Sequence, residues 1–316
     1  MPQIKRITTI LMAIAILIGC GGENSQTTTV EQKTIVALVV KSLANEFFVD
    51  LADSARAHQA ANADDYELIV NGLKDENDLS QQVTLIEQMT ARGADIIVVA
   101  PADSKALIPA IKRARQRGVI VVNIDNQLDR DLLSQADIQV PFVGPDNRAG
   151  ARLAADHLAT RLSRGDQVAI IGGIATAFNG QQRQLGFEDA MAAAEINVVS
   201  TQAGNWEQAR ASSVAAAMIA EHPDLKALLC SNDSMAIGAV AAVRQAGKTK
   251  QIQVIGYDNI DAARELLSQG DMLATVDQYG NQLAIYGIKY GLQILRSGQV
   301  PADKQTPVRL VTADNL

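Results

Sequence analysis

The amino-acid sequence predicts an α/β protein with two doubly wound, parallel-sheet lobes. From Thr34 onward, apolar runs rich in β-branched residues alternate with amphipathic segments. Runs that are apolar at successive positions are typical of strands buried on both faces of a parallel sheet. The alternation passes along the chain twice, and a length of 316 residues suits about two domains. Two βα arrays in sequence are therefore the simplest interpretation.

The patterns also place the individual elements. Strands of the first array are predicted at residues 34–40, 66–71, 94–100 and 118–124. After the second of these runs, a helix is indicated by an apolar stripe at helical spacing, formed by Leu79, Val83, Ile86 and Met89. The second array begins with the run at 142–144 and continues with runs at 166–172, 196–200, 226–230 and 252–256. The two arrays join near VPFVGPDNR, residues 140–148.

The N-terminal segment differs from the rest of the chain. Lys5 and Arg6 precede an apolar run at residues 10–20, which is too short to span a bilayer and is typical of a secretory signal. The run ends in Gly19-Cys20 and resembles the lipobox of bacterial lipoproteins. We therefore expect a lipoprotein signal peptide at 1–19, a lipid on Cys20 and a flexible tether at 20–33. A plain secretory signal with an incidental cysteine is the alternative.

Charge and composition argue against nucleic acid, metal and catalysis. The net charge of −7, with no basic block, disfavours a nucleic-acid partner. Cys230 is the only cysteine after Cys20, and no histidines stand at metal-ligand spacing, so we expect no disulfide, no metal site and no cofactor. The sequence contains no Walker lysine motif and no G-x-S-x-G elbow, and we expect no enzyme. Acid–base chemistry by Asp125 and Asp258 is the alternative.

Polar and aromatic side chains gather after the predicted strands, where open α/β sheets bind their ligands. Two carboxylates, Asp125 and Asp258, could accept paired hydroxyl hydrogen bonds. Amides that both donate and accept are found at Asn45, Asn126, Asn232 and Gln278. Apolar ring faces come from Phe47, Phe48, Trp206 and Tyr257. This set suits a neutral polyhydroxylated molecule, and the alternative is that the polar members are only helix N-caps.

Over nearly all of residues 34–316, the chain resembles the ribose-binding family of type I periplasmic sugar-binding proteins. The resemblance rests on ALVVKSLANEFFVDL, APADS, NIDNQ, HPDLKALLCSNDSMAIGA, VIGYDN and ATVDQ. It implies two lobes joined by a three-crossing hinge, with the sugar enclosed between them. The implied N-terminal lobe comprises 34–144 plus 279–307, and the implied C-terminal lobe comprises 145–278 plus 308–316.

The resemblance also implies a set of ligand-binding residues: Lys41, Asn45, Phe47, Phe48, Asp125, Asn126, Gln181, Trp206, Asn232, Tyr257, Asp258 and Gln278. Two of these positions depart from the ribose binders, which carry arginine where this chain has Asn126 and Gln181. Arg183, two residues further on, could partly replace the second arginine or be structural. Ribose binders also carry asparagine where this chain has Ala100. Because two guanidinium forks are missing, we expect another pentose, a hexose or a sugar alcohol rather than D-ribose. Lys41, which matches a lysine of hexose-binding relatives, favours a hexose.

The expected role is that of a lipid-anchored, extracytoplasmic, monomeric sugar-binding subunit of an ABC importer. Its expected partners are a monosaccharide or sugar alcohol and an ABC permease in the inner membrane. A sugar receptor for chemotaxis or for a sensor kinase, without transport, is the alternative. A transcription factor of the LacI type is disfavoured, because a signal and tether stand where a helix-turn-helix domain would be needed.

Overall fold

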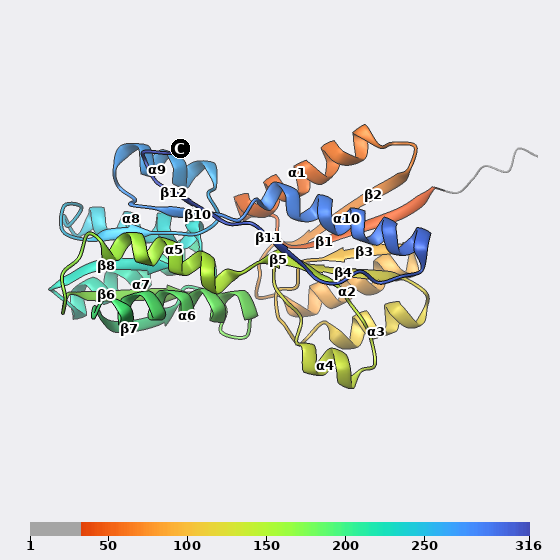
Figure 1. Ribbon diagram of the computed structural model, residues 1–316, viewed down its shortest axis with the longest axis horizontal. Helices are drawn as coiled ribbons and strands as arrows, with labels where there is room; N and C mark the ends of the chain where they lie inside the picture. The colour runs from red at the N-terminus through yellow and green to blue at the C-terminus, as the bar shows by residue number, and fades with distance from the viewer. Residues whose placement is uncertain (1–32) are drawn as a thin grey trace, which may run out of the picture. The chain divides into compact units, whose positions relative to one another are not determined.

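Two parallel sheets organise the computed structural model, which describes residues 33–316 (Figure 1). These residues form one compact unit. The predicted signal peptide, the lipidation site Cys20 and the tether up to residue 32 lie outside the described residues. Within residues 33–316, no helix is long and apolar enough to cross a bilayer.

The first lobe is built on a six-stranded sheet with the order β11-β5-β4-β3-β1-β2. Every neighbouring pair is parallel. The strands are β1 (Thr34–Ser42), β2 (Tyr66–Leu73), β3 (Ile96–Val99), β4 (Ile120–Ile124), β5 (Phe142–Pro145) and β11 (Lys304–Thr306). The four runs predicted for the first array are all strands of this sheet. The β-branched residues suit it because both of its faces are covered by helices.

Helices of the first lobe lie on both faces of this sheet. They are α1 (Glu46–Ala61), α2 (Leu79–Ala91), α3 (Ile108–Gln116), α4 (Arg130–Gln135) and α10 (Gly280–Ser297). The even-numbered residues of β1, such as Leu38, pack with α1 and α10, which run side by side (Figure 1). The odd-numbered residues, such as Val39, pack with α2 and α3. The alternation of side chains along a strand thus feeds two separate cores.

The second lobe is built on a four-stranded parallel sheet with the order β7-β6-β8-β9. Its strands are β6 (Gln167–Gly172), β7 (Asn197–Ala203), β8 (Leu225–Cys230) and β9 (Gln253–Ile255). Its helices are α5 (Asn147–Ala159), α6 (Phe178–Ala193), α7 (Gln208–Glu221), α8 (Asp233–Gln245) and α9 (Asp261–Gln269). α5 and α6 cover one face of the sheet, while α7 and α8 cover the other. An antiparallel pair, β10 (Thr275–Asp277) and β12 (Arg309–Val311), completes the lobe.

The chain passes between the lobes after β5, after β10 and after β11. The predicted class, two doubly wound lobes joined by a hinge, is therefore confirmed. One detail of the prediction is wrong. The run at 142–144, which the alternation of runs placed at the start of the second array although the lobe bounds implied by the resemblance included it in the N-terminal lobe, is β5 of the first sheet, where it pairs with β4 and β11. Its partner β11 comes from the far end of the chain, so the position of this short run could not be read from its neighbours in sequence.

Candidate ligand-binding site

A small cavity of about 20 Å³ lies between the two lobes. It is lined by Lys41, Asn45, Phe47, Phe48, Glu76, Asp125, Asn179, Arg183, Trp206, Asn232, Asp258 and Gln278. Most of these residues lie at or just beyond the carboxyl ends of strands, as expected for an open α/β sheet. The volume is about that of one water molecule. A larger ligand therefore enters only when the lobes separate.

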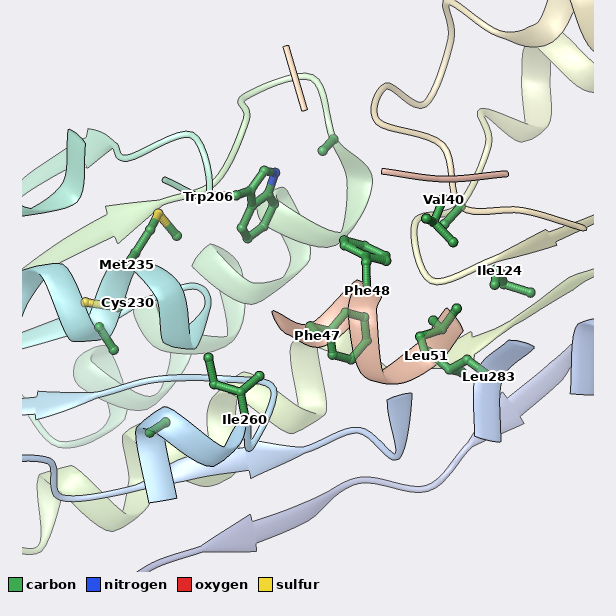
Figure 2. Packing of buried hydrophobic residues seen from close by; sticks show 14 of the residues in the cluster. Val40, Phe47, Phe48, Leu51, Ile124, Trp206, Cys230, Met235, Ile260 and Leu283 are labelled. Atoms are coloured by element: carbon green, nitrogen blue, oxygen red, sulfur yellow. The ribbon is translucent and has the colours of Figure 1, made fainter. Parts of the chain in front are cut away.

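Aromatic rings form the apolar walls of the cavity (Figure 2). Phe47 and Phe48 lie in the first turn of helix α1 and meet edge to face, with their ring centroids 5.0 Å apart. Two neighbours on a helix point about 100° apart, and both can be buried here because the first turn of α1 lies between the sheet of its own lobe and the second lobe. Trp206 lies across from them on the second lobe and is 5% exposed. Its indole packs so closely on Gly173 that a Cβ atom there would lie 2.0 Å from the ring.

Buried charges of the first lobe lie beside these rings. Lys41 Nζ lies 2.9 Å from Asp125 Oδ2, and the side chains of both residues are almost fully buried. The same ammonium lies 5.6 Å from the ring centroids of Phe48 and Trp206, within the range of a cation–π contact. Asp125 has a φ of 61°, in the left-handed region that aspartate tolerates better than most residues. This backbone turn directs the carboxylate of Asp125, which follows β4, towards Lys41 near the end of β1.

Glu76 adds a second carboxyl to the same wall. Asn45 Nδ2 donates to Glu76 Oε1 over 3.3 Å. Burial raises the pKa of the Glu76 carboxyl from 4.5 to about 7, although the nearby Lys41 ammonium and the Asn45 hydrogen bond oppose the rise. At neutral pH this carboxyl is therefore close to its midpoint of ionisation.

Arg183 organises the wall of the second lobe. Its Nε donates to Asn147 Oδ1 over 2.8 Å, and its Nη1 donates to the carbonyl oxygen of Ser231 over 2.8 Å. Nη1 also lies 3.4 Å from Asp258 Oδ1. The guanidinium carbon lies 3.7 Å from the centroid of the Tyr257 ring. The guanidinium is thus held over the face of the tyrosine ring and beside the carboxylate, so that its position is set before any ligand arrives.

Asp258 is the third buried carboxyl group of the cavity. Gln278 Nε2 donates to its Oδ1 over 2.7 Å. Burial raises the pKa of Asp258 well above its ordinary range, while the Arg183 guanidinium opposes the rise. The second lobe thus presents a carboxyl, an amide and a guanidinium that contact one another.

Several buried polar atoms of the cavity residues have no hydrogen-bond partner within the described chain. They include two donors, Arg183 Nη2 and Trp206 Nε1, and two acceptors, Asp125 Oδ2 and Gln278 Oε1. Asp125 Oδ2 is neutralised by Lys41 through the ion pair without a well-directed hydrogen bond. Buried polar groups without partners are costly, so these atoms are available to a ligand that both donates and accepts hydrogen bonds.

The structure brings most of the predicted ligand-binding residues together, but it places Asn126, Gln181 and Tyr257 elsewhere. Asn126 is buried beside the cavity, and its Nδ2 donates to the carbonyl oxygen of Pro101 over 2.9 Å. Tyr257 is buried beneath Arg183. Gln181 is exposed, and its Nε2 donates to the carbonyl oxygen of Ala175 over 2.7 Å.

Sequence reasoning did not assign Glu76, Asn179 or Arg183 to the ligand, although they line the cavity. Arg183 and Gln181 are two residues apart on α6 and therefore point about 200° apart, so only one of them can face the cavity. Asn179 belongs to the first turn of the same helix. Glu76 follows β2, and its position after a strand was the signal that could have identified it.

No group of three or more histidine, cysteine, aspartate or glutamate side chains within residues 33–316 is arranged to hold a metal ion. The three carboxyls at the cavity are instead accompanied by Lys41 and Arg183. The cavity therefore combines internally paired charges with aromatic walls, which suits a neutral polar ligand.

Comparison with known proteins agrees with the fold. Residues 36–299 match the sequence pattern of a protein family described as the periplasmic binding protein domain. A D-ribose/D-allose-binding protein of Pseudomonas aeruginosa is 53% identical over 287 residues, covering 89% of this chain and 90% of that protein.

Two crystal structures extend the comparison. An ABC transporter solute-binding protein of Burkholderia multivorans has 52% identity and a TM-score of 0.87, covering 89% of this chain and 100% of that chain. It holds an unknown ligand that was built as α-D-erythrofuranose. A periplasmic solute-binding protein of Actinobacillus succinogenes with bound D-allose has 33% identity and a TM-score of 0.85, covering 90% of this chain and 99% of that chain. The chain belongs to the ribose-binding-protein-like, type I periplasmic sugar-binding proteins, the solute-binding components of ABC importers.

Proposed function

We propose that this protein binds a monosaccharide, with a hexose of the D-allose kind preferred over D-ribose, and delivers it to an ABC permease. The observation that carries the proposal is the set of unpartnered donors and acceptors between aromatic walls, in particular Arg183 Nη2, Trp206 Nε1 and Gln278 Oε1. Each hydroxyl of a sugar both donates and accepts, and the C–H faces of its ring pack on aromatic rings. The names of the relatives, which mention D-ribose and D-allose, support this class of ligand.

The preference for a hexose over D-ribose rests on which cations face the cavity. Asn126 and Gln181, which stand where ribose binders carry arginine, contribute no guanidinium to the cavity. Arg183 supplies one guanidinium from a different position on α6, and Lys41 supplies a compact ammonium. A guanidinium fork and an ammonium present donors in different geometries, so this cavity is not equivalent to one with two arginines.

Binding without catalysis is part of the proposal. Asp125 is paired with Lys41, and Asp258 lies beside Arg183 and accepts from Gln278. Neither carboxylate is left free to act as a general base. The two groups instead hold fixed positions from which they accept hydroxyl hydrogen bonds.

Closure of the lobes gives the proposed binding mechanism. We assign 34–144 plus 279–307 to the N-terminal lobe and 145–278 plus 308–316 to the C-terminal lobe. The cavity is lined by both, so a sugar contacts its full set of partners only in the closed form and shifts the equilibrium towards it. The closed form is the one that would dock on the permease.

The protein works outside the cytoplasm, as its family does. We further propose that it is a monomer anchored to the membrane by a lipid on Cys20. Gel filtration and labelling of the full-length protein with a radioactive fatty acid test these two points, with Cys20→Ser as the control. A dimeric elution volume contradicts the monomer, and equal labelling of Cys20→Ser contradicts the anchor.

The test of the sugar class is a binding panel on the chain that starts at Lys33. The melting temperature is measured with pentoses, hexoses, deoxy sugars and sugar alcohols, because a ligand that binds the native state raises it. Trp206 is the only tryptophan, so its fluorescence gives each dissociation constant independently. A hexose that binds more tightly than D-ribose supports the proposal. If D-ribose binds most tightly, the argument from the two missing arginines is overturned. If no sugar of the panel raises the melting temperature, the assignment of a monosaccharide is overturned.

A further inference from the structure

Three helices of the second lobe, α6, α7 and α9, begin without a side-chain cap of their own, and two of them, α6 and α9, donate backbone hydrogen bonds to the first lobe. The residues that precede α6 and α9 are Ala177 and Ile260, and neither makes a side-chain capping hydrogen bond. In contrast, α5 and α8 of the same lobe are capped locally by Asp146 and Asn232. The first N–H groups of a helix have no partner within the helix, so those of α6 and α9 must find acceptors elsewhere.

The missing acceptors come from the first lobe. The N–H of Phe178 donates to Ser104 Oγ over 3.0 Å, and the N–H of Asn179 donates to Asn126 Oδ1 over 3.1 Å. These are the first two residues of α6. Two orphan donors of this helix are therefore satisfied across the boundary between the lobes.

The same arrangement is found at α9. The N–H of Asp261, its first residue, donates to Glu46 Oε1 over 2.9 Å. Glu46 is the first residue of α1 in the first lobe. Its negative charge is also favourably placed against the positive end of the α9 dipole.

The side chain of Asn126 is oriented to accept a hydrogen bond from the start of α6. Its Nδ2 donates to the carbonyl oxygen of Pro101 over 2.9 Å, which directs Oδ1 towards α6. The side chain is fully buried and does not line the cavity. Its amide therefore acts on the second lobe rather than directly on a ligand.

We propose that Glu46, Ser104 and Asn126 are positioning residues that cap α6 and α9 only when the lobes are closed. These caps then determine how much of the sugar-free protein is closed, and through that fraction they determine the apparent affinity for sugar. The inference rests on the proposed function for its effect on sugar affinity. Its effect on the sugar-free protein is independent of which sugar binds.

The expected magnitude follows from the value of a helix cap. Loss of a capping side chain reduces the stability of the capped arrangement about fivefold. The apparent dissociation constant varies inversely with the closed fraction, and this fraction falls by less than fivefold when the closed form is well populated. Glu46→Ala and Ser104→Ala should therefore each weaken sugar binding by up to about fivefold, and the double variant should weaken it by up to about 25-fold.

The primary experiment measures the distance between the lobes without sugar. Gln116→Cys on α3 and Glu221→Cys on α7, both exposed, carry nitroxide labels for pulsed electron paramagnetic resonance, while the native Cys230 is buried. The wild-type chain starting at Lys33, which carries every capping contact described, is compared with Glu46→Ala/Ser104→Ala. Dissociation constants are then measured by Trp206 fluorescence with D-allose or the tightest sugar of the panel.

Two further variants separate closure from general stability. Glu46→Gln keeps an oxygen acceptor and should retain the wild-type distances. Asp78→Ala removes a cap that acts wholly within the first lobe, where Asp78 Oδ1 accepts from the N–H of Gln81. It should lower the melting temperature without changing the distances or the sugar affinity.

We expect the double variant to lose the short-distance population and to bind sugar more weakly. The proposal is overturned if wild type and double variant have identical distance distributions, or if the wild type shows no closed population. It is also overturned if Asp78→Ala loses as much of the short-distance population as the double variant does. If no sugar of the panel binds, the proposed ligand class fails, and the sugar-free distances still decide the capping proposal.

Discussion

Replacing Glu76 by glutamine should change how stability depends on pH. Burial raises the pKa of this carboxyl from 4.5 to about 7, against the opposing effect of Lys41. The folded-state pKa is above the unfolded one, so the folded protein binds more protons between these pH values and loses stability as the pH rises through them. A difference of about 2.5 in pKa, at about 1.4 kcal/mol per unit, amounts to about 3–4 kcal/mol in total, of which about 3 kcal/mol falls between pH 4.5 and pH 8.

The assay compares the free energy of unfolding of the wild type and Glu76→Gln. Urea titrations at pH 4.5, 6 and 8 give this free energy for both proteins. Glutamine retains the oxygen that accepts from Asn45, and it has no charge to bury. The other buried carboxyls with raised pKa values, Asp233 and Asp258, are present in both proteins, and their contributions cancel in the difference.

We expect the variant to gain about 3 kcal/mol relative to the wild type between pH 4.5 and pH 8. A difference that stays constant within about 1 kcal/mol over this range would refute the reasoning. It would mean that the attraction of the nearby Lys41 ammonium offsets the burial of the Glu76 carboxylate completely.

Three other changes test the cavity through sugar affinity. Asp125→Asn should weaken sugar binding about tenfold to 100-fold because it removes a charged hydrogen-bond acceptor, while asparagine suits the left-handed backbone at this position. Calorimetry measures the affinity, and an unchanged value would place the ligand elsewhere. Trp206→Ala should cost about 1–3 kcal/mol of binding free energy, and Trp206→Phe should bind more nearly as the wild type does. If Trp206→Ala lowers the melting temperature but leaves the sugar affinity unaltered, the indole has only a structural role. Gly173→Ala should displace the indole, lower the affinity at least tenfold and shift the tryptophan emission, whereas wild-type emission and affinity would show that the contact relaxes freely.

The local pattern of the sequence was sufficient for the sheets and for much of the cavity. The central parts of the strand runs, such as 35–40 and 96–100, are apolar at every position because helices cover both faces of the sheet. Residues that directly follow a strand, such as Asp125 and Asp258, reach the cavity because parallel strands end at one edge. Both properties depend on order along the chain and can be recognised without any tertiary contact.

Side chains on helices and at the boundary between the lobes could not be assigned this way. Whether Gln181 or Arg183 faces the cavity depends on the rotation of α6 about its axis, which is set by packing on α5 and β6. Whether the amide of Asn126 faces a ligand or a helix depends on the carbonyl oxygen of Pro101, 25 residues away.

The sequence by itself therefore determined the architecture, the class of ligand and the side chains at the strand ends. Only the tertiary structure decided which helix residues complete the cavity and which side chains hold the lobes together. The physical reason is that strand order and burial pattern are local properties of the chain. Helix rotation and contacts such as that between Glu46 and Asp261 arise only when segments 215 residues apart pack together.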